Sequence, residues 1–509
     1  NVAYLYDQRD QIYNKFSETY LVGQTISYNE GQINAVNPQK LQAQFTLNNN
    51  TETNYLNNGF VEQNPEDIYL NVVNAVKNCL LNFETKGGNQ TEIKACGISN
   101  QRETFVVWDK DGVPLYNAVV WQCKRSIEIC NQLEEKGLEP LIKEKTGLII
   151  DPYFSATKLM WLYQHVDQVK QAIDLGEAYF GTVDTWLLFK LTNGEQYLTD
   201  HTNASRTLFF NIHTLNWDAE ILNEMGLAKL NLPQIKSSSA NYGSSTINGL
   251  FNSPLIISSM IGDSHAAAFG EGCFSAGTAK ATLGTGCSVL MNIGEKPITS
   301  HKGMVTTICW SIENRVDYAL EGVIVSCGAT IEWLKNEMGL FQNSKETEDM
   351  AQSVTDNNGV YLIPAFSGLG APHWDMSRRG EIKGLTFNTN KNHIVLAALE
   401  SVAFQLKDVI LAMEDDSKVV LSELMVNGGM TANSFLIQLI ANTLQCKLNK
   451  GNTPDVSALG AGLLAALHVG IFANLDEIKS LKNHFQTFEP KSNHHQYHRE
   501  WLRHIKAKA

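Results

Sequence analysis

The chain has 509 residues and a mass of 56.6 kDa. A single hydrophobic core of ordinary size does not organise a chain of this length, so we expect at least two domains. Hydrophobic residues make up 43% of the chain and charged residues 18%, which is typical of a globular protein that dissolves in water. The formal net charge of -13 argues against nucleic acid as the main partner, although a local basic site could still bind a small anion.

The nine cysteines form no CxxC or CxxH pair, and their odd number and scattered spacing favour free thiols in a reducing compartment. No run of residues approaches the roughly 18 apolar positions of a membrane span, and no signal peptide is recognised. We therefore expect a cytoplasmic protein without a membrane span, whose cysteines are small buried apolar residues. The oligomeric state is left open, with a homo-oligomer as one alternative.

The first half of the chain alternates short strands with helices. Asn64 and Pro65 start a helix whose apolar residues recur at helical spacing from Ile68 to Leu80. A later strand ends at the polar stretch SNQRET (99–104). This order predicts an α/β domain with a mixed sheet, whose ligands gather where strands end in loops. The expected strands lie at 20–27, 32–36, 40–47 and 93–98, with a hairpin turn at 109–112 and a second helix at 124–136.

A second half with the same plan starts near Pro254. The apolar strand LIISSMIG (255–262) ends at Asp263, and a hairpin at 278–292 follows, whose turn carries Gly284 and Gly286. Two similar α/β halves imply a central cleft between domains at 1–253 and 254–509. The further expected elements are a helix at 328–339, a strand at 421–429 that runs into glycines, and a helix at 433–444.

From about Gly59 to Phe485 the chain resembles the FGGY carbohydrate kinase family, over more than four fifths of its length. Each motif alone is a weak signal, whereas their joint order along the chain is specific. The two family signatures fit at 153–165 and 380–400. Other matching stretches are GISNQRETFVVWD (97–109), VVWQCKRS (119–126), DPYFSATKLMWL (151–162), TDHTNASRTLFFNIHTLNWD (199–218), YALEGVIVSCGATIEWL (318–334) and IPAFSGLGAPHWD (363–375).

The resemblance implies two actin-like, ribonuclease H-like α/β domains that close on magnesium ATP and a sugar or polyol such as glycerol. The reaction would transfer the γ-phosphoryl group of ATP to a substrate hydroxyl, with ATP and Mg²⁺ as cofactors. Carried over by motif, Asp263 is the catalytic base. The polyol would contact Arg102, Glu103, Trp121, Tyr153, Asp263 and Ser264, and the nucleotide would contact Thr285, Gly328, Glu332, Gly429 and Asn433.

These residue types suit that chemistry. Each hydroxyl of a polyol both donates and accepts hydrogen bonds, so Arg102 as donor and Glu103 as acceptor form a suitable pair. The aromatic faces of Trp121 and Tyr153 would cover the C–H side of the substrate. Asp263, at the end of an apolar strand, can accept the hydroxyl proton, a role worth roughly 10²–10⁴-fold in rate.

The first phosphate-binding turn departs from the family pattern D-x-G-T-T-S-x-R. The family's arginine and hydroxyls contact phosphate there, and a glutamate facing a triphosphate costs free energy unless a cation compensates. A second register over residues 2–10 fits the first two positions with Asp7 and Gln8 but supplies no Gly-Thr-Thr. In the register that aligns 19–25, the family's Asp, Gly, Thr, Thr, Ser and Arg are replaced by Thr25, Ser27, Tyr28, Asn29, Glu30 and Gln32.

Four further positions differ from the family members that phosphorylate glycerol. Ser264 replaces a Gln and Ser288 a Phe, which predicts a roomier, less apolar pocket, while Glu332 replaces a Gln and Asn427 an Asp near the nucleotide. Three functions stay open: a glycerol-like polyol kinase, a kinase-fold binding or regulatory protein without turnover, and an FGGY kinase for a larger sugar or polyol.

Overall fold

The computed structural model describes residues 21–22, 42–43, 51–56, 59–451, 453, 455–481 and 486–506. Of the region before residue 50, it describes β1 (Leu21–Val22) and β2 (Gln42–Ala43), which pair antiparallel. The turn between them and the strand expected at 32–36 lie outside the described residues. The altered phosphate-binding turn is therefore still a prediction from sequence.

The first half is built of short strands with helices around them, as predicted. Asn64 caps the first helix, accepting a hydrogen bond from the backbone N–H of Glu66 at 3.0 Å, and Ile68 and Leu80 bury its apolar face. The strands are β3 (Thr53–Tyr55), β4 (Val61–Gln63), β5 (Cys96–Asn100), β6 (Phe105–Trp108), β7 (Ala118–Val119), β8 (Tyr179–Thr182), β9 (Leu198–Asp200), β10 (Phe210–Asn211), β11 (Asn216–Trp217), β12 (Gln234–Lys236) and β13 (Ser244–Ser245).

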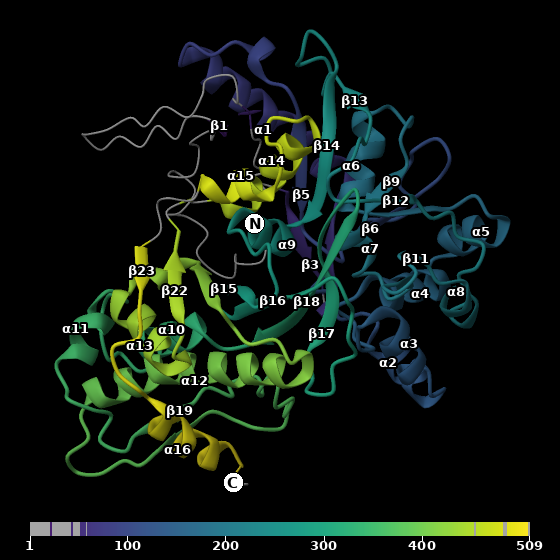
Figure 1. Cartoon of the computed structure of the whole chain (residues 1–509). Helices are drawn as coiled ribbons and strands as arrows, with labels where there is room; N and C mark the ends of the chain where they lie inside the picture. Colours follow the sequence, from purple (N-terminus) through teal and green to yellow (C-terminus); the bar gives the residue numbers. More distant parts are fainter. Residues whose placement is uncertain are drawn as a thin grey trace.

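The helices of this half between residues 127 and 224 lie at the right of Figure 1, and its first helix lies near the top. The five-stranded sheet has the order β3-β4-β7-β6-β8, and the buried residues of β6 form part of two apolar clusters on its opposite faces. The helices are α1 (Pro65–Thr85), η3 (Gln90–Glu92), α2 (Ile127–Glu135), α3 (Glu139–Thr146), α4 (Ser155–His165), α5 (Asp167–Leu175), α6 (Val183–Leu191), α7 (His201–Ala204) and α8 (Ala219–Glu224).

The strand β14 (Leu255–Gly262) has the bounds that its sequence predicts, but it pairs in parallel with β5 and antiparallel with β13 of the first half. Residues on either side of the expected boundary at 253/254 thus share one sheet. The division into 1–253 and 254–509 stays a prediction, and this pairing favours a boundary after Gly262.

The second half is organised around a seven-stranded sheet of order β17-β18-β16-β15-β21-β22-β23. The predicted hairpin is formed by β15 and β16, and β21 pairs in parallel with β15. The remaining strands are β15 (Thr278–Leu283), β16 (Cys287–Gly294), β17 (Val305–Ile312), β18 (Arg315–Ile324), β19 (Tyr361–Ile363), β20 (Glu381–Lys383), β21 (Glu423–Asn427), β22 (Lys447–Lys450) and β23 (Gln486–Phe488).

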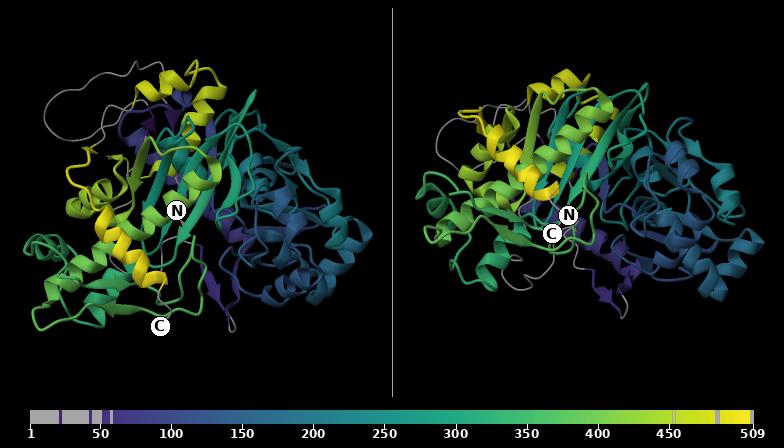
Figure 2. Two further views of the ribbon diagram at one scale, coloured as in Figure 1. Left: turned by 60° about the horizontal axis from the view of Figure 1, so that its bottom comes forward. Right: turned by 90° about the horizontal axis from the view of Figure 1, so that it is seen from below.

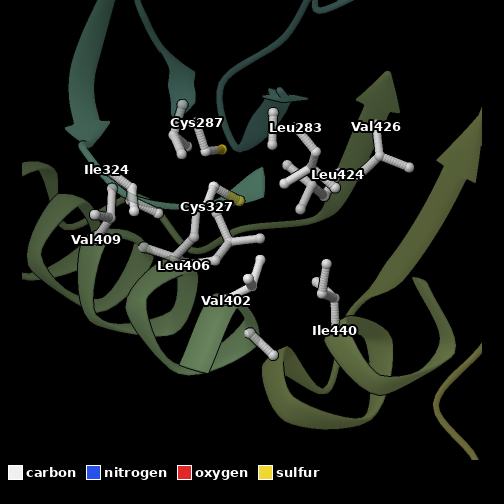
Figure 3. Close-up of a cluster of buried hydrophobic side chains, with 14 of the residues drawn as sticks. Leu283, Cys287, Ile324, Cys327, Val402, Leu406, Val409, Leu424, Val426 and Ile440 are labelled. Carbon is white, nitrogen blue, oxygen red and sulfur yellow. The ribbon is translucent and has the colours of Figure 1, made fainter. Parts of the chain in front are cut away.

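Helices lie on both faces of this sheet (Figures 1 and 2). Figure 3 shows one face, where Val402 and Leu406 of α12 pack against Leu283, Cys287 and other side chains of the sheet. The helices are α9 (Asp263–Gly270), α10 (Gly328–Asn336), α11 (Glu346–Gln352), α12 (Lys391–Ser417), η4 (Gly429–Ala432), α13 (Ser434–Leu444), α14 (Val456–His468), α15 (Leu475–Ser480) and α16 (His495–Lys506).

The helix α14, near the end of the chain, packs against β5, β14 and α9. The Ser259 hydroxyl donates to the Ala461 carbonyl at 2.7 Å. A Cβ at Gly460 would lie 1.8 Å from the Ala266 carbonyl oxygen, so only glycine permits this close approach of α14 to α9. The β14 strand and the start of α9 are thereby held between both halves of the chain.

The described cysteines form no disulfide, and all of them are buried except the half-buried Cys79, which agrees with the prediction that they are small buried residues. Within the described ranges, no helix is both long and apolar enough to cross a membrane. The central cleft expected between the halves stays a prediction.

Candidate active site

The predicted polyol-binding pair lies at the end of β5, where the strand turns into β6. Arg102 and Glu103 are both buried, with side chains 7% and 1% exposed. Glu103 has φ of 61°, a left-handed conformation that costs a residue with a Cβ about 1–3 kcal/mol and recurs at functional sites. The Ser155 hydroxyl of α4 stabilises this turn by donating to the Glu103 carbonyl at 2.8 Å.

The candidate base lies beside this pair because β14 and β5 are parallel neighbours. Gly262, just before Asp263, is in register with Asn100, just before the QRET turn. The Arg102 Nε is consequently 3.4 Å from the Asp263 Oδ1, although the residues are far apart in the chain. The Asp263 carboxylate is 17% exposed at the first residue of α9, so it can meet a substrate while an arginine stabilises its charge.

The two predicted aromatic side chains contact each other next to the acidic and basic pair. Trp121 and Tyr153 pack edge to face, with ring centroids 5.6 Å apart and planes at 72°. The backbone N–H of Trp121 donates to the Thr104 hydroxyl at 3.1 Å, and the buried Lys158 ammonium donates to the Tyr153 carbonyl at 2.5 Å. Both rings are half-buried, which leaves apolar surface for the C–H side of a polyol.

Two buried residues complete the charged part of the site. The Glu321 carboxylate of β18 accepts a hydrogen bond from Arg102 Nη2 at 2.9 Å, and its other oxygen lies 2.7 Å from Arg206 Nη1. Arg206 also pairs with Glu103 at 2.5 Å and lies 5.7 Å from the centre of the Tyr153 ring. Burial by itself raises the pKa of Glu321, but the two arginines outweigh it and lower the pKa well below its usual range. The pKa of Glu103 is raised instead, because burial outweighs the opposing effect of Arg206 and Arg102. The two arginines and two carboxylates therefore form one buried network of ion pairs.

Ser264 and Ser288 form a polar wall beside the base. Their hydroxyl oxygens are 3.5 Å apart, and the Ser288 hydroxyl lies 3.4 Å from Glu321 Oε1. The buried Lys280 ammonium donates to Ser264 Oγ at 2.7 Å and to Thr282 Oγ1 at 3.1 Å. The wall carries the two predicted hydroxyl groups, and the Lys280 ammonium that contacts Ser264 was not expected from the sequence. The roomier pocket stays a prediction.

Three of the residues predicted to bind the nucleotide, Thr285, Gly328 and Gly429, lie in loops that follow β15, β18 and β21 of the seven-stranded sheet. The backbone N–H of Gly328 donates to the Gly284 carbonyl at 2.9 Å, and that of Ala329 donates to the Thr285 carbonyl at 3.0 Å. A Cβ at Gly328 would lie 3.4 Å from the Met430 sulfur, just after Gly429. Leu283, Cys287 and Cys327, in the core of Figure 3, anchor the ends of two of these loops.

The other two predicted nucleotide residues are linked to these loops through the segment around α11. Asn433 caps α13, accepting from the backbone N–H of Leu436 at 2.9 Å, and its amide donates to Thr347 at 3.1 Å. Glu332, 44% exposed, accepts from Ser344 and pairs with Lys335 at 3.1 Å. At the end of β21, the amide of Asn427 donates to Glu271 at 2.8 Å, so a carboxylate stays next to the position where the family has Asp.

Comparisons with known proteins identify the family and the fold. Residues 33–270 match the model of the N-terminal domain of the FGGY family of carbohydrate kinases, and residues 279–469 match the model of its C-terminal domain. The chain belongs to the FGGY family. A glycerol kinase of Thermoanaerobacter pseudethanolicus is 46% identical over 446 residues, covering 87% of this chain and 89% of that protein. A glycerol kinase of Klebsiella pneumoniae is 46% identical over 422 residues, 83% of each chain.

Solved structures agree with this assignment. The Plasmodium falciparum glycerol kinase with ADP has a TM-score of 0.86 and 36% identity, covering 92% of this chain and 94% of that one. A gluconate kinase of Lactobacillus acidophilus, at 21% identity and a TM-score of 0.78, matches over 89% of each chain and agrees in fold alone. The two FGGY domains therefore have the mixed α/β architecture that the sequence predicts.

Sequence reasoning missed three charged residues of this FGGY site. Arg206 and Glu321 lie within stretches that match the family, yet neither was expected to contact Arg102 or Glu103. Lys280 lies at an alternate position of the apolar strand TAKATL, and that pattern is the signal that could have found it, because a charge on a buried strand needs a partner.

Proposed function

We propose that this chain transfers the γ-phosphoryl group of MgATP to a hydroxyl of glycerol or a similar small polyol. The observation that carries the proposal is the 3.4 Å approach of Arg102 to Asp263 at the ends of paired strands. The glycerol kinases at 46% identity and the structural match to a glycerol kinase with ADP support the same substrates.

Each part of the site has a role in this reaction. Arg102 donates to the polyol hydroxyls and Glu103 accepts from them, while Trp121 and Tyr153 cover the carbon chain and exclude water. Asp263 takes the proton from the hydroxyl as that oxygen attacks phosphorus. The loops of Thr285, Gly328 and Gly429 would hold the nucleotide, and Mg²⁺ bound with ATP would neutralise charge on its phosphates.

A second candidate function is phosphorylation of a larger sugar or polyol. The polar wall of Ser264 and Ser288 favours it, because two small hydroxyl side chains leave room for a longer substrate with a further hydroxyl. The third reading, a binding or regulatory protein without turnover, depends on the altered first turn. We further propose that the protein acts in a reducing compartment such as the cytoplasm, since its described cysteines form no disulfide.

The test is ADP release by the purified full chain with MgATP and a panel of glycerol, erythritol, xylitol and xylulose. A kcat/KM highest for glycerol supports the main proposal, and a higher value for a longer substrate supports the second. Binding of glycerol in titration calorimetry without ADP release from any substrate would contradict both kinase functions and support the binding protein.

A further inference from the structure

Lys280 is a buried cation whose contacts are neutral. Its side chain is 1% exposed in β15, and its neighbours Ala279 and Ala281 point into the core on the opposite face. Its ammonium donates hydrogen bonds to the hydroxyls of Ser264 and Thr282, and no carboxylate of the described residues forms an ion pair with it. Burial, followed by the nearby Arg102 charge, lowers the pKa of Lys280.

This arrangement differs from that of the other buried cations of the site. Arg102 contacts the carboxylates of Glu321 and Asp263, and Arg206 contacts those of Glu321 and Glu103. An ammonium kept in the interior without a contacting carboxylate is unfavourable, because two hydroxyls replace only part of its hydration. The two bonds use two of its three N–H donors, so one donor is available to an anion that enters the site.

The position of Lys280 defines which anion that would be. On one side its partner Ser264 follows the candidate base Asp263 directly, at the start of α9. On the other side its partner Thr282 is in register with Asn427, and the two strands end in the loops of Thr285 and Gly429. A phosphoryl group moving from a nucleotide on those loops to a hydroxyl at Asp263 must pass between these two ends.

We propose that Lys280 is a catalytic residue whose ammonium contacts the transferred phosphoryl group, an inference that rests on the proposed function. In the reaction the polyol O–H bond breaks and its proton goes to Asp263, the new O–P bond forms, and the P–O bond to ADP breaks. Lys280 keeps its three protons throughout and stabilises the negative charge on the phosphoryl oxygens.

The test compares Lys280→Met with Lys280→Gln, which retains a hydrogen-bond donor without the charge, and with Lys418→Met as a control on a lysine that is 78% exposed. Titration calorimetry measures the affinities for glycerol and for glycerol phosphate. We expect both Lys280 variants to bind glycerol within threefold of wild type and glycerol phosphate at least tenfold more weakly, with kcat lower by about 10²-fold or more. Lys418→Met should change none of these quantities.

Several outcomes overturn the proposal. One is an equal loss of affinity for glycerol and glycerol phosphate, which indicates a packing role only. Another is an unchanged affinity for glycerol phosphate in a folded variant, as judged by its thermal unfolding midpoint. If Lys280→Met does not fold, Lys280→Gln alone decides between these outcomes. If the wild type releases no ADP, the proposed function fails, while a selective loss of glycerol phosphate binding would still assign Lys280 to the phosphate site.

Discussion

Arg102 and Glu321 lie 219 positions apart in the chain and form a buried hydrogen-bonded ion pair at 2.9 Å. Arg102 comes from the N-terminal FGGY domain and Glu321 from the C-terminal one. Arg102, which is expected to bind the polyol, is therefore oriented by the Glu321 carboxylate of the domain whose loops are expected to bind the nucleotide. Polyol binding and the relative position of the two domains should depend on each other through this pair.

Glu321→Gln should weaken both the fold and the binding of glycerol. The substitution removes the charge that faces Arg102 and Arg206, and removing one partner of a buried pair costs about 3–5 kcal/mol. Because each arginine keeps another carboxylate, we expect the lower end of that range for the free energy of unfolding. Urea unfolding and glycerol titration measure the two effects. Glu500→Gln, which changes an exposed pair with Arg503, serves as the control, and an equally small effect of both variants would contradict this role of Glu321.

Asp263→Asn should abolish turnover and retain polyol binding. The amide has a similar shape but cannot take the hydroxyl proton, so the rate should fall by roughly 10²–10⁴-fold. Steady-state kinetics and glycerol titration are measured together, with Asp415→Asn on the surface as the control. A variant that keeps more than a tenth of the wild-type rate would remove Asp263 from the role of base.

Ser288→Phe should shift preference toward glycerol and away from longer polyols. The Ser288 hydroxyl faces Ser264 at 3.5 Å, so a ring at this position would fill the space that a longer substrate needs. We expect the ratio of kcat/KM for glycerol over erythritol to change by an amount on the order of 1 kcal/mol. An unchanged ratio would show that Ser288 does not line the pocket.

Asp184→Asn should change how stability depends on pH. Burial, and next the Asp200 carboxylate, raise the pKa of Asp184 from 3.8 to about 7. The folded state then holds a proton that the unfolded state releases, so this contribution to stability is complete below pH 3.8 and is lost as the pH rises to about 7. The unfolding free energy of wild type relative to the variant should fall by up to about 1.4 kcal/mol per pH unit across this window. A constant difference from pH 4 to 7 would show that Asp184 is ionised throughout.

Much of the fold could be predicted because its signals are local. An apolar run predicts β14, apolar residues at alternate positions predict β15, and Asn64 with Pro65 predicts the start of α1. The place of β14 was harder to predict. Its sequence fixes where the strand begins and ends, but its partner β5 is chosen by packing across more than 150 residues, which no local pattern encodes.

The candidate site likewise contains residues with a local sequence signal and residues without one. Motifs predict Asp263, Arg102 and Tyr153 as site residues, because each motif lies where a strand or helix begins or ends. No motif points to Glu321, and the pattern around Lys280 indicates only a buried charge, since the contacts of both residues come from the folded chain. From sequence, a charged residue on an apolar strand indicates only that it needs a polar partner, and the structure identifies that partner.

The most direct test of the account is phosphorus NMR of the full chain with MgATP and glycerol, alongside Asp263→Asn. The account predicts that wild type converts the γ-phosphate resonance of ATP into that of glycerol phosphate, in equal amount with ADP, while the variant binds glycerol and forms product at least about 10²-fold more slowly. Formation of inorganic phosphate instead of glycerol phosphate, or equal product from both proteins, would contradict it.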